Sequence, residues 1–194
     1  MTTDDHGREA AIRLRSACET FDPDIKSHLE DVTRYSLGLG RQIGLSAAHL
    51  ERIALAAPLH DLGKIGLPLS IFTKKGALTA AERKQVEAHT VIGHRLLDGS
   101  ASPILRCAAD LALSHHEWWN GAGYPHRDKG EDIPFDARLV AIADVFDALV
   151  SQRAYKEAWD MDRVVEEMRR QRAIQFDPEL LDVFLGHLPV ESAA

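Results

Sequence analysis

The stretch His60-Asp61-Leu62-Gly63-Lys64-Ile65-Gly66-Leu67-Pro68 combines two side chains of metal-ligand type with a turn rich in glycine. Imidazole nitrogen and carboxylate oxygen both bind transition-metal ions. Outward from this stretch, side chains of the same kind lie on what read as separate helices: His28, His89, His115, His116 and Asp144. Each histidine taken singly is more often an ordinary core or surface residue, but their joint occurrence favours a site for at least two metal ions.

The spacing of these residues indicates how two ions would be shared. Adjacent residues on a helix point about 100° apart, so His60-Asp61 and His115-His116 can each spread over two ions. A carboxylate has two oxygens and can bridge; we expect Asp61 to be the bridge and Asp144 to complete the shell of the first ion. Mixed nitrogen and oxygen donors without thiolates favour iron or manganese over structural zinc. Paired ions activate water at neutral pH and typically serve phosphate-ester hydrolysis.

Helical periodicity extends along most of the chain, and no convincing strand pattern occurs. The expected helices cover 9–20, 24–43, 46–62, 79–97, 102–116 and 136–150, with two more starting at Asp160 and at Asp177-Pro178. Pro58 predicts a kink or break in the helix expected over 46–62. Residues 117–135 contain three glycines and two prolines and predict an ordered functional loop. The predicted fold class is all-α, arranged as a helical bundle.

Composition restricts the classes of function. The chain has 194 residues, enough for one domain, and a net charge of −7, which argues against binding a nucleic-acid polymer. No apolar run approaches the ~20 residues that span a membrane, and residues 1–8 lack the apolar centre of a signal peptide. Cys18 and Cys107 form no motif, which indicates reduced thiols and a cytoplasmic location.

Several motifs together resemble those of a known family. Residues 60–68 are similar to the motif of HD-superfamily phosphohydrolases, and residues 115–125, His-His-Glu-Trp-Trp-Asn-Gly-Ala-Gly-Tyr-Pro, add a Gly-Tyr-Pro signature. The match continues through 133–134, 137–138, 142–149, 153–156 and 176–178. The chain therefore resembles an HD-GYP domain, a helical HD core with a C-terminal helical extension.

The resemblance also implies domain boundaries. The catalytic domain is expected to cover residues 22–188. Residues 1–21 are expected to be an N-terminal tail, disordered over 1–8, with residues 9–20 forming either a short helix or the remnant of a linker from an upstream domain. Residues 189–194 are expected to be a C-terminal tail.

The resemblance implies a metal-dependent hydrolase of bacterial signal transduction. Its substrate is cyclic di-GMP, a second messenger, which is cleaved to linear pGpG and in many members onward to GMP. The implied metal ligands are His28, His60, Asp61, His89, His115, His116 and Asp144. Some members bind a third ion through a glutamate one turn before the first histidine. Here that position is Asp24, whose shorter side chain puts a third ion in doubt.

Other residues are candidates for contact with the substrate. Lys64 lies one turn beyond His60 and can donate to a phosphate as a point charge, unless it is a solvated loop lysine. The resemblance implies that Arg153 and Lys156 hold the second phosphate, against the alternative of a solvated basic face. Tyr124 can stack on a guanine, bond to a phosphate or only brace its loop. Asp147 is expected to orient a ligand histidine rather than to bind metal itself.

Two alternatives to this function stay open. One is a non-catalytic cyclic-dinucleotide sensor or interaction module, and the complete ligand set with Lys64 argues against it. The other is an HD phosphohydrolase acting on another cyclic dinucleotide, such as cyclic GMP-AMP, because no base-reading residue is evident. The expected partner is a cyclic dinucleotide, without nucleic-acid polymer or membrane. A protein partner at the Gly-Tyr-Pro loop and a homodimer are further possibilities.

Overall fold

The described part of the chain is mainly helical, with one isolated β-bridge between Arg172 and Phe176. The computed structural model describes residues 3–22, 25–72, 74, 76–152 and 158–188. Its α-helices are α1 (Thr3–Phe21), α2 (Ile25–Gln42), α3 (Ala47–Ala56), α4 (Leu69–Phe72), α5 (Ala80–Leu97), α6 (Pro103–Ser114), α7 (Phe135–Val150), α8 (Met161–Arg170) and α9 (Pro178–Gly186). Short 3-10 helices are η1 (Ala57–Leu59), η2 (Leu62–Gly66) and η3 (Gly130–Asp132). The prediction of an all-α class is confirmed.

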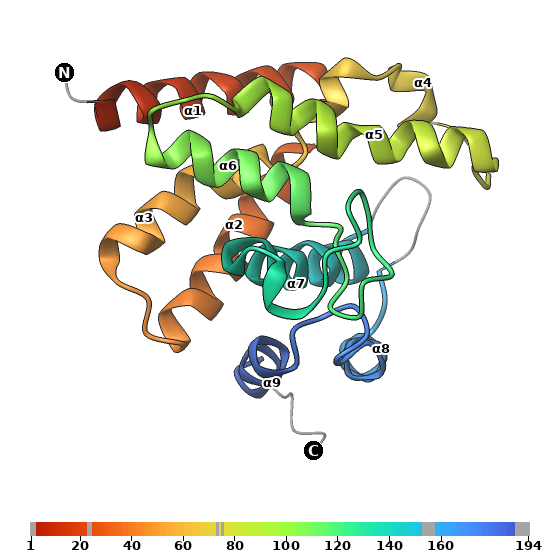
Figure 1. Cartoon of the computed structure of the whole chain (residues 1–194). Coiled ribbons are helices and arrows are strands. Elements are labelled where there is room, and N and C mark those ends of the chain that lie inside the picture. Colours follow the sequence, from red (N-terminus) through yellow and green to blue (C-terminus); the bar gives the residue numbers. More distant parts are fainter. Residues whose placement is uncertain (1–2, 23–24, 73, 75, 153–157, 189–194) are drawn as a thin grey trace.

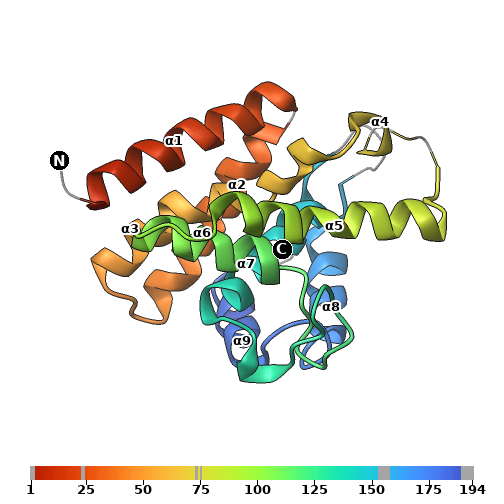
Figure 2. The ribbon, with the colours of Figure 1, turned by 45° about the horizontal axis from the view of Figure 1, so that its top comes forward.

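Two pairs of packed helices form the centre of the molecule. α5 packs against α6, and α2 packs against α7, while α3 and α1 both contact α6. Figures 1 and 2 show α1 on one side of the molecule and α8 and α9 at the opposite end. The core includes fully buried side chains from these central helices, among them Leu29, Ile53, Leu111, Ile142 and Phe146. No helix in the ranges given above combines the length and apolarity that a membrane crossing requires.

The N-terminal helix is longer than predicted. Residues 3–8, expected to be disordered, belong to α1. The reason is tertiary: Ala11 and Cys18 of α1 are buried in the core, and the helix contacts α6, η1 and η2. The sequence does not reveal this packing, because the buried positions of α1, which are Gly7, Ala11 and Cys18, carry small side chains or none.

The break at Pro58 occurs as predicted and determines where the central motif lies. Ser46 caps α3 by accepting the N–H of His49, but the helix ends at Ala56 rather than continuing to Leu62. The chain tightens into η1, with Pro58 in its first turn, and then into η2. His60 and Asp61 lie in the turn between these two short helices, where successive side chains diverge.

A close approach of two glycines joins this turn to α5. A Cβ atom at Gly63 would lie 1.9 Å from the carbonyl oxygen of His89 and 2.5 Å from the nitrogen of Gly93. Only glycine leaves room for the two backbones at this distance. The segment that carries His60-Asp61 is thereby held directly against the helix that carries His89.

Local capping residues mark the starts of α5, α6, α8 and α9, whereas α4 was not expected and α7 starts without a side-chain cap. Thr79 and Glu82 form a capping box at the start of α5, and Asp160 and Asp177 cap α8 and α9. Ser102 caps α6, whose last turn leads directly into His115. These signals depend on residues within a single turn, which is why the sequence alone reveals them.

The capping box predicts a measurable pH dependence. Contacts from Lys74 and from Thr79 lower the pKa of the Glu82 carboxyl from 4.5 to about 2. A lowered pKa stabilises the fold above the unfolded value of 4.5, and this contribution is lost as the pH falls toward 2. Glu82→Gln should therefore lower the free energy of unfolding at pH 6, and the difference from wild type should shrink at pH 3 in urea titrations. A difference that is equal at both pH values would contradict the assignment, and Glu131→Gln controls for net charge.

Candidate metal centre

The ligand candidates that lie in the described residues converge on one buried centre. Two groups can each hold a cation, with ligand atoms within 4.8 Å of one another. One group is Asp61, His89, His115 and His116, and the other is His28, His60 and Asp61. Asp61 belongs to both. The structure thus brings together side chains from α2, the η1–η2 turn, α5 and the end of α6.

The two oxygens of Asp61 face different histidines. Its Oδ1 lies 3.4 Å from Nε2 of His89 and 3.8 Å from Nε2 of His115. Its Oδ2 lies 3.5 Å from Nε2 of His60. This arrangement fits the expected bridging role of Asp61, because each of its two oxygens faces histidines of a different ligand group.

Asp144 and Asp147 flank the histidine on α2. Nε2 of His28 lies 3.4 Å from Oδ1 of Asp144, which is also 4.0 Å from Nε2 of His60. On the other side of the ring, Nδ1 of His28 lies 2.7 Å from Oδ2 of Asp147. Asp147 in turn accepts a hydrogen bond from Ser151. A carboxylate on Nδ1 leaves Nε2 directed at the centre, the arrangement that ligand histidines commonly show.

Backbone carbonyls orient three further imidazoles in the same way. Nδ1 donates to the carbonyl of Ala57 in His60, of Val86 in His89 and of Leu111 in His115, at 2.7–2.9 Å. A carbonyl only accepts, so Nδ1 carries the proton and Nε2 presents a lone pair to the centre.

The buried nitrogens of the centre fit a cation. Nε2 atoms of His89 and His115 face each other at 3.3 Å, and two lone pairs at this distance repel unless a positive charge lies near them. Nε2 of His60 is buried and has no hydrogen-bond partner in the described part of the chain. A buried orphan acceptor is unfavourable, and a bound cation would satisfy it.

The electrostatics keep most of these groups in their metal-binding forms. Burial, with the neighbouring His60, lowers the pKa of His115 to about 3. Burial likewise lowers the pKa of His89 and, together with His115, that of His116. Burial would raise the pKa of Asp61, but the Lys64 ammonium and the His60 ring hold it well below 3.8. The pKa of His60 is the exception, since burial would lower it but Asp61 and Asp144 raise it. The other buried imidazoles are neutral and, with the ionised carboxylate, form a donor set for a divalent ion.

Two of the expected substrate contacts, Lys64 and Tyr124, lie at the edge of this centre. The Lys64 ammonium pairs with the carboxylate of Asp61. The ring of Tyr124 lies 4.8 Å from the ring of His116, at an interplanar angle of 32°. Tyr124 belongs to the Gly-Tyr-Pro loop, residues 117–134, because Phe135, expected as the last residue of this loop, already starts α7.

The two glycines of this loop serve different purposes. Gly121 has a φ of +80°, a backbone angle that L side chains resist. The φ of Gly123, by contrast, is not in the left-handed region. Space is the requirement there: a Cβ would lie 2.4 Å from both the carbonyl oxygen of His116 and the nitrogen of Trp118.

Three predicted residues lie outside the described part of the chain: Asp24, Arg153 and Lys156. One residue that the sequence analysis gave no role, Glu117, is buried at the base of the Gly-Tyr-Pro loop. Its position directly after His115-His116 is the signal that could have drawn attention to it.

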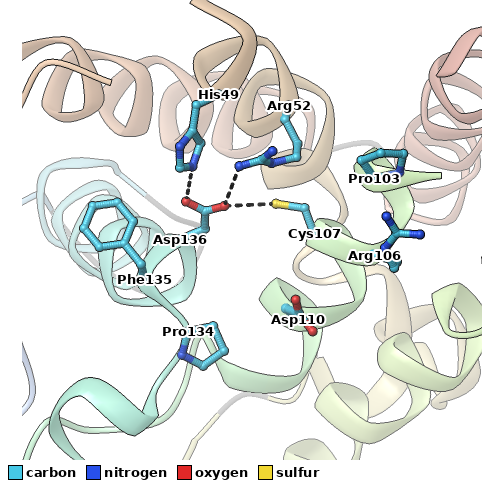
Figure 3. A pocket seen from close by; sticks show the side chains of 9 residues that line it. All are labelled: His49, Arg52, Pro103, Arg106, Cys107, Asp110, Pro134, Phe135 and Asp136. Atoms are coloured by element: carbon cyan, nitrogen blue, oxygen red, sulfur yellow. Dashed lines mark hydrogen bonds and ion pairs between the residues drawn. The ribbon is translucent and has the colours of Figure 1, made fainter. Parts of the chain in front are cut away.

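A separate cavity of about 320 Å³ lies among α3, α6 and the start of α7 (Figure 3). Asp136 is at its centre, 2.6 Å from Nε2 of His49 and 3.4 Å from Sγ of Cys107, with Arg52 at 4.0 Å. None of the ligand candidates lines it. Because its central carboxylate is already paired on both oxygens, we read this cluster as a contact among three helices.

A known family of proteins matches most of this chain. The HD domain family model matches residues 12–180. The chain belongs to the HD domain family. The predicted resemblance to HD-superfamily proteins is therefore confirmed.

Relatives and a solved structure extend this likeness. The HD domain chain is 44% identical to the cyclic di-GMP phosphodiesterase response regulator RpfG of Xanthomonas campestris pv. campestris, over 92% of the chain and 47% of that protein. It is 37% identical to the 3'3'-cGAMP-specific phosphodiesterase 2 of Vibrio cholerae, over 93% of the chain and 34% of that protein. The chain thus spans half or less of the length of these curated relatives.

The fold also matches an HDG"Y"P protein from Bdellovibrio bacteriovorus with a TM-score of 0.67. That match has 16% identity and covers 94% of this chain and 61% of the other. At this identity the match bears on the fold alone, and it confirms the helical HD architecture.

The contact between Asp147 and His28 gives a prediction for metal affinity. Asp147→Asn keeps the shape of the side chain and an oxygen that can accept from Nδ1 of His28, but removes the charge. We expect metal affinity to fall by about 10-fold or more, with the thermal midpoint of the metal-free protein little changed. Titration of the metal-free variant with Mn²⁺ measures this, with Asp182→Asn, at an exposed position of α9, as the control. Unchanged affinity would contradict an orienting role for Asp147.

Proposed function

We propose that this chain is the catalytic domain of a metal-dependent phosphodiesterase that hydrolyses cyclic di-GMP to pGpG and then to GMP. The proposed catalytic unit covers residues 22–188, with α1 packed on it. The single observation that carries the proposal is the sharing of Asp61 between two buried ligand groups. A carboxylate common to two cation sites is typical of two-metal hydrolysis of phosphate esters. The family and the names of the relatives support the same reaction.

The proposed ligands divide between the two groups. His89, His115 and His116 would hold one ion, and His28, His60 and Asp144 would hold the other, with Asp61 common to both. The ions, iron or manganese in this proposal, would polarise the scissile phosphate and lower the pKa of water at the site. Asp147 and the backbone carbonyls hold the imidazoles in the tautomer that binds.

The remaining residues would bind and orient the substrate. Lys64 lies beside Asp61 and can turn its ammonium to a phosphate oxygen. Tyr124 presents its ring beside His116, where a guanine or phosphate of the bound substrate would lie. Arg153 and Lys156 are proposed to hold the second phosphate.

A product assay tests the proposal directly. The full chain is loaded with Mn²⁺, or with Fe²⁺ under anaerobic conditions, and its metal content is measured. Cyclic di-GMP is then supplied, and pGpG and GMP are separated by chromatography. Turnover with metal and none after chelation is the expected result. Tight binding of cyclic di-GMP without metal or turnover would favour a sensor instead.

Replacing Lys64 separates substrate binding from metal binding. In Lys64→Ala the ligand groups stay intact, so the metal content should match wild type. Loss of one charged donor to the phosphate should lower kcat/KM by about 10- to 100-fold. Lys84→Ala, at an exposed position of α5, is the control and should retain full activity. Loss of metal together with activity would show that Lys64 acts on the centre itself.

A second substrate is favoured by one specific observation. The relative named as specific for 3'3'-cGAMP is 37% identical over 93% of the chain. The same product assay with 3'3'-cGAMP, at equal concentration, decides between the two. A kcat/KM that is higher for 3'3'-cGAMP than for cyclic di-GMP would make 3'3'-cGAMP the proposed substrate. The proposed metal centre would stay the same.

A further inference from the structure

Glu117 links the two sides of the Gly-Tyr-Pro loop. It follows the ligand pair His115-His116 directly and is only 3% exposed. Its Oε1 accepts the backbone N–H of His126 at 2.6 Å and of Arg127 at 3.1 Å. Both donors come immediately after the Tyr124-Pro125 peptide. The carboxylate thus ties the start of the loop to a segment nine and ten residues further along.

The segment tied in this way presents Tyr124 to the ligand cluster. The backbone nitrogen of Tyr124 donates to the carbonyl oxygen of His116 at 3.1 Å. Its ring packs beside the imidazole of His116. The absence of a side chain at Gly123 permits this approach, as the 2.4 Å separations there require. Tyr124 is therefore held by the turn that Glu117 closes.

A buried carboxylate is an unfavourable choice for packing alone. Burial raises the pKa of the Glu117 carboxyl, and its Oε2 is buried without a hydrogen-bond partner among the described residues. Leaving a buried polar atom unpaired destabilises a fold. The carboxylate has one oxygen that accepts hydrogen bonds from two N–H groups of the loop. No apolar side chain can accept these bonds.

We propose that Glu117 is a positioning residue: it closes the Gly-Tyr-Pro loop so that the ring of Tyr124 stands beside His116 and contacts the bound cyclic dinucleotide. The inference rests on the proposed function for the identity of the substrate. Glu117 touches neither substrate nor ion in this scheme, because both of its acceptor contacts are to the backbone of the loop.

Limited proteolysis of the full chain tests loop closure without any activity measurement. Arg127 and Lys129 are exposed, and trypsin cleaves after them once the loop opens. Glu117→Ala should speed this cleavage by about tenfold or more, because both N–H groups lose their acceptor. Glu117→Gln keeps an acceptor oxygen and should stay within about threefold of wild type. Glu131→Ala, at an exposed position of the same loop, is the matched control.

An unchanged cleavage rate in Glu117→Ala would overturn the proposal. If Glu117→Ala does not yield folded protein, Glu117→Asp serves in its place, since it withdraws the carboxylate by one methylene and leaves a smaller void. It too should cleave faster than Glu117→Gln, and equal rates for Asp, Gln and wild type would overturn the proposal.

Kinetics then test the route through Tyr124. In the metal-loaded protein, Glu117→Ala should raise KM for cyclic di-GMP about tenfold, with metal content unchanged and rescue by Glu117→Gln. The double variant with Tyr124→Leu should be no worse than Tyr124→Leu alone, because the two changes remove one contact. If the effects of the two substitutions on KM were additive, Glu117 would not act through Tyr124. If wild type does not cleave cyclic di-GMP at all, the proposed function fails, while the proteolysis result still decides the role of Glu117 in the loop.

Discussion

Asparagine in place of Asp61 will lower cyclic di-GMP turnover by on the order of 1,000-fold. Asp61 is the one residue common to both ligand groups, and its two oxygens face different histidines. An amide of the same shape carries no charge and offers only one oxygen, so it cannot serve both groups. Elemental analysis of the loaded variant should find less bound metal, and chromatography should find no pGpG above background.

The control for this variant is Asp110→Asn. Asp110 is exposed on α6 and lines the separate cavity rather than the metal centre. Its substitution removes the same charge from the chain and should retain metal and turnover. Circular dichroism of both variants checks that the helices are intact. Full metal content with wild-type turnover in Asp61→Asn would contradict the assignment of the centre.

Gly63→Ala will destabilise the protein by about 3 kcal/mol or more and weaken metal binding. The added Cβ would meet the His89 carbonyl at 1.9 Å, and that atom belongs to a helix backbone rather than to a flexible side chain. η2 and α5 must therefore move apart. Because the His60-Asp61 turn leads directly into η2 and His89 lies on α5, the movement separates Asp61 from the other ligands of its group. Urea unfolding and Mn²⁺ titration measure the two effects.

Gly38→Ala is the matched control, and its effect should have the opposite sign. Gly38 lies inside α2, and a Cβ there would meet nothing within 4 Å. Alanine in a helix interior is more stable than glycine by about 0.5–1 kcal/mol. The same chemical change should therefore stabilise at one position and destabilise at the other. Equal effects at the two sites would contradict the close packing of η2 against α5.

Signals that depend on neighbours in sequence predicted the structure well. Ser46, Thr79 and Asp160 were expected to begin helices, and each caps one. Each cap depends on a hydrogen bond within one turn, so a few consecutive residues suffice to identify it. The length of α1 was not predictable in this way. It depends on Ala11 and Cys18 packing into a core built by residues far along the chain.

The sequence by itself determined which side chains are available to bind metal and in what order they occur, because residue type sets donor chemistry and helical periodicity sets which residues share a face. Only the tertiary structure decided how they meet. It turned one oxygen of Asp61 toward His89 and His115 and the other toward His60. It also brought Gly63 against α5 and closed the loop through Glu117. Such contacts join residues distant in sequence, and they depend on the shape of the whole core, which no local pattern encodes.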